Sequence, residues 1–369
     1  MAGSLVLAAA SAAIGAVSVS VIEPAERPHC DARALPVVDL HGSALDQAAA
    51  RAIPSIIRLD TDASRPSTVG SGIVLTADGL ILTSSHVLPA RTRTTGPDPL
   101  VATFADGRTV PLTIVGTDPV TDVAVVRAEH VSGLSPITLG SSTALRVGQT
   151  VAAVGSPLGL ESSVTRGVIS ALHRAVPLLV DSNGRTTVLD TIQTDAATTF
   201  GSSGGALIDT NGRLVGLNSL IALPGVGFAL PVDPVMRIAN ELISSGTAAH
   251  AWLGVQVKTT SSGTRGAVVI ATSPRSPAAA AGLYPGTVIT NIDGRVITNA
   301  ETLVAAIMSK APGDIVATGY VDSAGTRRTL DTVLDSDLTT RAATDTPGNP
   351  PGISALGQGM SRRQPPWSA

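Results

Sequence analysis

Three side chains in the sequence have the types that nucleophilic hydrolysis requires. Ser203 lies in the run Gly201-Ser202-Ser203-Gly204-Gly205, where glycines let a substrate carbonyl approach and let backbone N–H groups meet a developing oxyanion. His86 follows an apolar, strand-like run, and Asp122 opens the β-branched run 123–126. A serine hydroxyl needs an imidazole as its base, and a carboxylate can orient that imidazole. Taken singly, the three have plainer interpretations: a flexible Gly/Ser turn, a core histidine and a turn or cap aspartate.

The order of these residues along the chain separates two hydrolase architectures. His86, Asp122 and Ser203 follow one another with gaps of 36 and 81 residues. In α/β-hydrolases the nucleophile comes first, whereas chymotrypsin-like proteases have the order His, Asp, Ser. We therefore expect a catalytic triad of Ser203, His86 and Asp122, with the backbone N–H groups of Gly201 and Ser203 as the oxyanion hole.

Short strands joined by tight turns must position this triad. Asp-Gly and Asn-Gly pairs tolerate the positive φ of type I′ hairpin turns. Four such pairs separate strand-like runs: Asp78-Gly79, Asp106-Gly107, Asn183-Gly184 and Asn211-Gly212. Repeated short strands over 55–230 predict antiparallel barrels or a sandwich. Helices are expected over 44–57, ending near Pro54, and over 231–243.

Composition excludes several classes of protein. The chain has 369 residues of which 43% are hydrophobic, enough for a real core, so a wholly disordered chain is excluded. The net charge of −3 and the lack of a Lys/Arg cluster argue against nucleic-acid binding. Cys30 is the single cysteine, which excludes an internal disulfide and a cysteine zinc cage. No metal or organic cofactor is expected.

Several segments resemble the HtrA (Deg) family of serine proteases. Three surround the expected triad residues and two more lie between and after them: 69–74 with 79–83 and 86–87, Thr121-Asp122-Val123-Ala124-Val125, 192–197 with 201–205, 154–160 and Gly227-Phe228-Ala229-Leu230-Pro231. The resemblance covers 45–334. It implies a mainly β fold, with a chymotrypsin-like double six-stranded β-barrel protease domain over 44–246 and an α+β PDZ domain over 250–334.

The expected PDZ domain begins with a segment similar to the family's carboxylate-binding loop. The backbone N–H groups of Leu253, Gly254 and Val255 are expected to hold a peptide C-terminal carboxylate while the peptide adds as a β-strand. The alternative is an ordinary strand start. Leu303 and Ile307, four apart on an expected helix, share one face that lines a side-chain pocket or belongs to the core.

Substrate preference is expected from three pocket residues. In this architecture Ala197, six residues before Ser203, floors the primary specificity (S1) pocket, so a basic side chain meets no counter-charge there. Leu220 and Ile221 are expected to narrow the opposite wall. These residues predict cleavage after small aliphatic residues such as Val, Ala or Ile.

The sequence also departs from the family's usual pattern. Thr199-Phe200-Gly201-Ser202-Ser203 stands where relatives usually have Asn-Pro-Gly-Asn-Ser, so the oxyanion loop is expected to be less preorganised. Ser202 replaces the aspartate that would pair with a new N-terminus in zymogen activation, and the resemblance implies regulation by loop ordering and PDZ ligands instead. Family members form trimers through N-terminal aromatic packing. A homotrimer is expected here, although 44–69 contains no aromatic residue.

The ends of the chain differ from the globular part. Residues 1–22 carry no charged side chain and are interpreted as a signal peptide or membrane anchor, with an Ala-rich helix, buried or disordered, as the alternative. Residues 23–43 are a linker, and 335–369 a disordered tail. We expect an exported protein of the cell envelope, either membrane-anchored and facing outward or secreted/periplasmic.

The leading functional hypothesis is an ATP-independent serine endopeptidase that acts on unfolded or misfolded proteins through an acyl-enzyme. Its PDZ domain is expected to bind peptide C-termini and to regulate the protease. The alternatives are a chaperone or regulatory peptide-binding protein with little proteolysis, and a structural protein with a degenerate protease fold.

Overall fold

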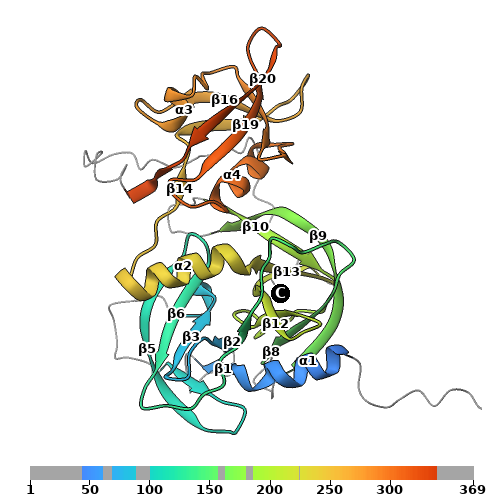
Figure 1. The fold of residues 1–369 in the computed structure, drawn as a ribbon, viewed down its shortest axis with the longest axis vertical. Helices are drawn as coiled ribbons and strands as arrows, with labels where there is room; N and C mark the ends of the chain where they lie inside the picture. The colour runs from blue at the N-terminus through green and yellow to red at the C-terminus, as the bar shows by residue number, and fades with distance from the viewer. Residues whose placement is uncertain are drawn as a thin grey trace, which may run out of the picture. The chain divides into compact units, whose positions relative to one another are not determined.

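The structure is a computed structural model. It describes residues 44–60, 69–88, 100–156, 163–179, 186–223 and 225–338, without the side chains at 69, 179, 186 and 220–223. Three groups of strands follow one another along this part of the chain; a helix precedes the first group and another lies between the second and the third (Figure 1). Residues 1–43, expected to hold the export segment and linker, and the turn at 183–184 lie outside the described residues.

The first group of strands closes into a barrel. Its strand order is β1-β2-β3-β6-β5-β4, and neighbouring strands run antiparallel throughout. The strands are β1 (Ile56–Asp60), β2 (Val69–Val74), β3 (Leu80–Thr83), β4 (Val101–Thr103), β5 (Thr109–Asp118) and β6 (Val123–Ala128). Gly79 in the β2–β3 turn has φ of 103°, as the Asp-Gly pattern predicts. This is the six-stranded barrel expected for the first half of the protease.

The second group of strands also closes on itself. The ring runs β11-β8-β9-β10-β13-β12 and returns through the pairing of β11 with β12, while β7 adds to the outer edge of β12. The strands are β7 (Thr138–Leu139), β8 (Thr150–Gly155), β9 (Ser163–Leu179), β10 (Thr186–Thr194), β11 (Ala206–Asp209), β12 (Arg213–Leu223) and β13 (Val226–Pro231). The expected double barrel is therefore confirmed, with one short strand added.

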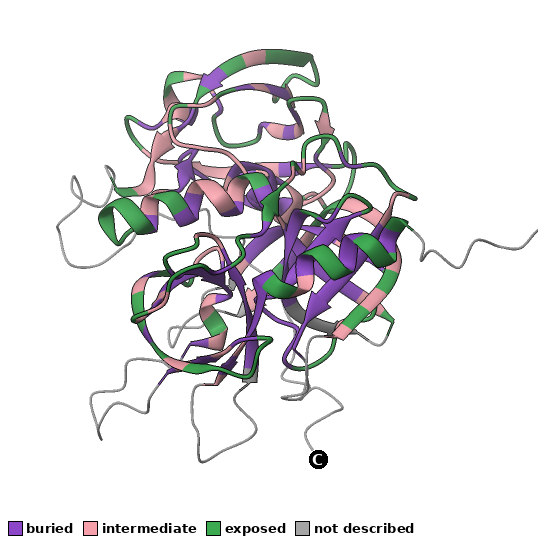
Figure 2. Ribbon diagram, turned by 60° about the horizontal axis from the view of Figure 1, so that its bottom comes forward, coloured by how far each residue is buried: buried purple, intermediate pink, exposed green. Residues whose placement is uncertain are grey.

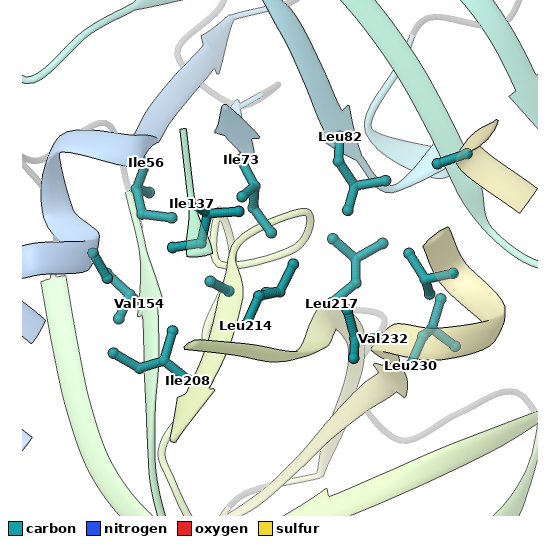
Figure 3. Packing of buried hydrophobic residues seen from close by; sticks show 14 of the residues in the cluster. Ile56, Ile73, Leu82, Ile137, Val154, Ile208, Leu214, Leu217, Leu230 and Val232 are labelled. Atoms are coloured by element: carbon teal, nitrogen blue, oxygen red, sulfur yellow. The ribbon is translucent and has the colours of Figure 1, made fainter. Parts of the chain in front are cut away.

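Strands β3 and β6 of the first barrel are buried at nearly every residue, which explains their nearly continuous apolar sequences. Successive side chains of a strand point to opposite faces. Ile57, Val74 and Ile81 pack in a cluster made only of first-barrel elements. Their chain neighbours Ile56, Ile73 and Leu82 belong to another cluster, which also contains Val154, Ile208, Leu214 and Leu217 of the second barrel (Figure 3). One face thus fills the barrel, and the other forms the seam between the barrels.

Two helices cover the ends of this seam. α1 (Ala44–Ala52) contacts β8 and β11, and a short 3₁₀ turn, η1 (Ile53–Ser55), leads from it into β1. α2 (Val232–Ser245) contacts β5 and β6 of one barrel and β12 and β13 of the other. Each helix has a buried and an exposed side (Figure 2). Gly246, with φ of 75°, ends α2 as a left-handed C-cap.

The remaining described chain forms the expected α+β domain. Its main sheet has the order β15-β16-β17-β19-β20, with β18 paired to β17, and β14 pairs with β21 in a separate ribbon. The elements are β14 (Ala251–Trp252), β15 (Val255–Thr259), β16 (Ala267–Thr272), α3 (Pro277–Ala280), β17 (Val288–Ile292), β18 (Arg295–Val296), α4 (Ala300–Met308), β19 (Ile315–Val321), β20 (Arg327–Val333) and β21 (Asp335–Ser336). Asn299 begins α4 with a capping box.

The regular structure ends later in the chain than the sequence predicts. Leu334 was expected to be the last ordered residue, but Asp335–Ser336 pair with Ala251–Trp252, so regular structure extends into the expected tail. A two-residue strand carries too little periodicity to be seen in a sequence. Within the described ranges, no helix has the length and apolar character needed to cross a membrane.

A buried imidazole joins the segment after α2 to two carboxylates. His250 Nε2 lies 2.8 Å from Asp118 Oδ2 at the end of β5, and Nδ1 lies 3.3 Å from Asp337 Oδ2 just after β21. The His250 side chain is only 7% exposed. Burial alone would lower the pKa of His250, but the hydrogen bonds to Asp118 and Asp337 outweigh it and raise the pKa from 6.5 to about 9. The protonated imidazole therefore ties both carboxylates together.

This triad of charges makes stability depend on pH in a defined direction. Because the folded-state pKa of His250 lies above its unfolded value, its contribution is complete below pH 6.5 and disappears as the pH rises to about 9. The difference is roughly 3 kcal/mol in the free energy of unfolding. Denaturant titrations at both pH values should show this loss in the wild type and a flatter profile in His250→Gln. The control is His130→Asn, an exposed histidine, and an equal pH slope in all three proteins would contradict the assignment.

Candidate active site

A buried aspartate lies at the centre of the expected site. Asp122 immediately precedes β6, is 1% exposed and has φ of 60°, a conformation that aspartate tolerates better than most residues. Its carboxylate accepts hydrogen bonds from the backbone N–H of His86 (3.0 Å) and from the hydroxyl of Ser219 (3.0 Å). A carboxylate buried this deeply is costly unless donors surround it, and these donors meet that need.

The imidazole of His86 faces this carboxylate. His86 lies in the 3₁₀ turn η2 (Ser85–Val87) that follows β3, and its Nδ1 lies 2.8 Å from Asp122 Oδ2 and 2.9 Å from Oδ1. The Ser85 N–H donates to the Asp122 carbonyl, which fixes the turn against the β5–β6 connection. With Nδ1–H directed at the carboxylate, Nε2 carries the lone pair and is available as a base. The side chain is 36% exposed, so a substrate can reach it.

Ser203 is held in a crowded loop next to this pair. The residue is 5% exposed, and its Oγ has no hydrogen-bond partner among the described residues. Gly204 follows with φ of 82°, and a Cβ there would lie 2.2 Å from the Ser71 carbonyl oxygen, so only glycine fits. The expected histidine–aspartate pair is therefore formed, whereas the serine–histidine hydrogen bond is not. Such a bond often tightens only when substrate binds.

The loop before Ser203 is a β-turn. The Ser202 N–H donates to the Thr199 carbonyl at 2.9 Å, and Gly201 has φ of 90° at the third position. These features define a type II turn, in which glycine at the third position is strongly preferred. Within the described part of the chain, the N–H groups of Gly201 and Ser203 have no acceptor. Both expected oxyanion donors are thus free to bind an oxygen.

The expected primary pocket is only partly described. Ala197 is exposed, and its carbonyl accepts a hydrogen bond from the Thr165 hydroxyl at 2.7 Å. The nearby Asp195 carboxylate accepts from the Val168 N–H at 2.6 Å, so this negative charge is already engaged by the backbone. Leu220 and Ile221 lie on β12, but their side chains are outside the described residues. The expected pocket walls therefore stay a prediction.

The expected carboxylate-binding loop connects β14 to β15. Leu253 is fully buried, and Gly254 has φ of 82° with the Ser276 Cβ 2.2 Å from where its own Cβ would stand. Val255 begins β15, which lies at the edge of its sheet. Leu303 and Ile307 are 0% exposed and pack in the core of this domain, which favours the core alternative for them.

Two serines near the triad were not identified from the sequence as site residues. Ser219, whose hydroxyl donates to Asp122, lies in the segment considered only as a pocket wall, and Ser71 contacts the loop of Ser203. Neither has a sequence signal of its own, because the contact joins residues far apart in the chain. Among the described residues, no three His, Cys, Asp or Glu side chains gather as metal ligands.

Comparisons with known proteins agree with this geometry. Residues 70–217 match the family described as trypsin-like peptidase domain, and residues 251–324 match the PDZ domain family. The chain is 46% identical to serine protease PepD of Mycobacterium tuberculosis, over 90% of this chain and 76% of PepD. It is 36% identical to a probable periplasmic serine endoprotease, DegP-like, of Halomonas elongata, over 68% of this chain but only 52% of that protein.

Solved structures show the same similarity. The HtrA-type protease AlgW with a tripeptide has a TM-score of 0.60 and 32% identity, and covers 80% of this chain and 97% of its own. The serine endoprotease from Yersinia pestis has a TM-score of 0.54 and 27% identity, and covers 80% and 98%. At these values the likeness extends over both the double barrel and the following domain.

The donors around Asp122 allow a test of its environment. Ser219→Ala removes one hydrogen bond to a buried carboxylate, so we expect the free energy of unfolding to fall by about 1–3 kcal/mol. Ser142→Ala is the matched control, because its hydroxyl donates to the carboxylate of Asp233 at an exposed position and should matter much less. Denaturant unfolding of the three proteins measures this, and equal losses in both variants would contradict the geometry.

Proposed function

Because the chain belongs to the HtrA family of serine endopeptidases, we propose that it hydrolyses unfolded or misfolded proteins at a triad of Ser203, His86 and Asp122. The observation that carries the proposal is the pairing of His86 Nδ1 with Asp122 at 2.8 Å, which leaves Nε2 as a base. The N–H groups of Gly201 and Ser203, which have no acceptor among the described residues, complete the arrangement that acyl transfer requires.

The reaction proceeds in two halves. Ser203 Oγ attacks the scissile carbonyl carbon while His86 Nε2 takes the hydroxyl proton, and the N–H groups of Gly201 and Ser203 bind the oxyanion. His86 then gives this proton to the leaving amine as the C–N bond breaks, which leaves an acyl-enzyme. Water, deprotonated by His86, hydrolyses the ester and regenerates Ser203. Asp122 orients the imidazole and stabilises its charged form, and neither ATP nor a cofactor enters the cycle.

Small aliphatic residues are the proposed preference at the cleavage site. Ala197 supplies no negative charge to a basic side chain, and the nearby Asp195 carboxylate is engaged by the N–H of Val168. Leu220 and Ile221 are proposed to narrow the pocket from β12. Val, Ala or Ile would then fit, whereas burying Lys or Arg without a counter-charge would be unfavourable.

The PDZ domain is proposed to bind peptide C-termini. β15 is an edge strand, so an added peptide strand can pair with it, and the loop of Leu253, Gly254 and Val255 would hold the terminal carboxylate. A route from this domain to the protease is available, because Val304 and Ala305 of α4 share a buried cluster with Val188 of β10. Peptide binding beside α4 is therefore proposed to regulate the protease.

A location and an assembly state are also proposed. Relatives such as that of Halomonas elongata are named probable periplasmic endoproteases, which supports an exported protein of the cell envelope. We propose that residues 1–22 act as the signal peptide or anchor, and that the protein assembles as a homotrimer.

A second candidate function is peptide binding with little cleavage, as in a chaperone. The Ser203 hydroxyl has no hydrogen-bond partner among the residues that the structure describes, which favours this candidate, because a serine without a hydrogen bond to its base is not activated in the resting protein. The two candidates differ in what the loss of Ser203 does.

Removal of the nucleophile tests the enzyme directly. The full chain and Ser203→Ala are incubated with unfolded β-casein, with and without an apolar C-terminal peptide as PDZ ligand, and the products are analysed by mass spectrometry. We expect cleavage only in the wild type and in the control Ser142→Ala. Cleavage that survives in Ser203→Ala would refute the triad, and no cleavage by any protein would favour the chaperone function.

A charge change at the pocket floor tests the substrate preference. Ala197→Asp should raise kcat/KM for an Arg peptide relative to the matched Val peptide by about 10-fold or more, because it supplies the missing counter-charge. Ala197→Asn has nearly the same shape without the charge and should leave the preference for Val unchanged. Equal hydrolysis of both peptides by the wild type would show that Ala197 does not floor the pocket.

A further inference from the structure

Ser71 joins the first barrel to the loop that carries the nucleophile. It lies on β2, is 0% exposed, and makes three hydrogen bonds across the seam. Its backbone N–H donates to the Ser203 carbonyl at 2.8 Å, and its Oγ donates to the Gly201 carbonyl at 2.6 Å. The same Oγ accepts from the Ser156 N–H at 2.8 Å. One small residue thus holds the carbonyl groups of both residues that supply the oxyanion donors.

Ser71 holds two of the peptide planes in this loop. A carbonyl shares its rigid plane with the N–H of the next residue. In the plane after Gly201, the carbonyl is held by Ser71 and the N–H of Ser202 donates to Thr199. In the plane after Ser203, the carbonyl is again held by Ser71 and the N–H of Gly204 donates to Asn218 at 2.8 Å. The Gly201 N–H lies in the plane before these two. The Ser203 N–H lies in the plane between them, whose Ser202 carbonyl accepts from the Gly205 N–H at 3.0 Å. The described residues offer neither the Gly201 N–H nor the Ser203 N–H an acceptor.

Two local hydrogen bonds join the ends of this turn: the Ser202 N–H donates to the Thr199 carbonyl at 2.9 Å, and the Thr199 N–H donates to the Ser202 hydroxyl at a longer 3.3 Å. Glycine adopts positive and negative φ with similar ease, so Gly201 does not by itself specify the turn type. Phe200 precedes it with 70% of its surface exposed, and it lacks the fixed φ of a proline. Neither Phe200 nor Gly201 fixes its own backbone angles, so tertiary contacts add to these two local bonds in holding the conformation. The Ser71 hydroxyl is a side-chain contact to the turn from a strand that is itself rigidly packed between its neighbours.

We propose that Ser71 is a positioning residue for catalysis: its hydroxyl holds the 199–203 turn so that the N–H groups of Gly201 and Ser203 converge on the oxyanion. Ser71 touches neither substrate nor the reacting atoms, and acts through the carbonyl of Gly201. The inference rests on the proposed triad mechanism. It also assigns Ser156, at the end of β8, to the same hydrogen-bonded group.

Removing the hydroxyl should weaken transition-state binding more than substrate binding. In the full chain, Ser71→Ala is expected to lower kcat by about 10–100-fold with KM nearly unchanged, somewhat less than the loss of an entire oxyanion donor. Affinity for a peptide boronate, whose tetrahedral adduct places an oxygen in the oxyanion hole, should fall by the same factor. Affinity for the corresponding product peptide should not change.

Two further variants separate this role from a structural one. Ser71→Cys keeps the side-chain volume but donates poorly, so it should lose kcat as Ser71→Ala does even if the alanine variant folds badly. Thr191→Val removes a buried hydroxyl that donates to the Arg174 carbonyl in the second barrel, and should keep kcat and boronate affinity. Equal losses in Thr191→Val, or parallel losses of boronate and product-peptide affinity, would overturn the proposal.

A measurement without catalysis separates failure of this inference from failure of the proposed function. Hydrogen–deuterium exchange of the segment 199–205 should accelerate in Ser71→Ala and Ser71→Cys but not in Thr191→Val. Unchanged exchange there would overturn the role of Ser71 whatever the activity. The opposite outcome is also informative. If exchange is faster in the two Ser71 variants but the wild type neither cleaves peptides nor binds the boronate, the triad mechanism is refuted and the role of Ser71 in holding the turn is established.

Discussion

The buried carboxylate of Asp122 is the constraint on which the rest of the site depends. A charge that is 1% exposed must be surrounded by donors, and those donors come from different parts of the chain. His86 provides a backbone N–H and an imidazole from the turn after β3, and Ser219 provides a hydroxyl from β12. Satisfying one carboxylate therefore brings the first barrel, the second barrel and the proposed base into one fixed arrangement.

The seam between the barrels serves packing and chemistry together. Its apolar cluster draws on side chains from both barrels, so neither barrel can bury this face alone. Hydrogen bonds of Ser71 and Ser219 cross the same seam. Ser71 donates to Ser203, the proposed nucleophile, and Ser219 donates to Asp122, the carboxylate that orients the proposed base. Because the apolar packing fixes the spacing of the barrels, these polar contacts form at defined lengths. The same packing of the two barrels thus positions both the proposed oxyanion donors and the proposed base.

A second polar group links the end of the protease to the domain that follows it. His250 lies between Asp118, in the strand that leads to Asp122, and Asp337, next to β21. Asp118 also accepts the N–H of Val120, so the ion pair reaches the connection that carries Asp122. The segment after α2 therefore does more than connect the two domains. It places a charged contact close to the backbone on which the proposed triad depends.

Much of this protein was determined by its sequence alone, because the deciding signals are local. Apolar strand-like runs and Asp-Gly turns were enough to predict antiparallel barrels or a sandwich, and the resemblance of five segments to the HtrA family implied the double barrel. The order of His86, Asp122 and Ser203 was enough to propose a triad, and the structure places the first two side chains 2.8 Å apart. Contacts between residues distant in the chain are visible only in the folded protein. They are the hydrogen bonds from Ser71 to Gly201 and from Ser219 to Asp122, and the position of His250 between two carboxylates. An isolated serine or histidine carries no periodic pattern, so its partner is set by how the barrels pack and not by its sequence neighbours.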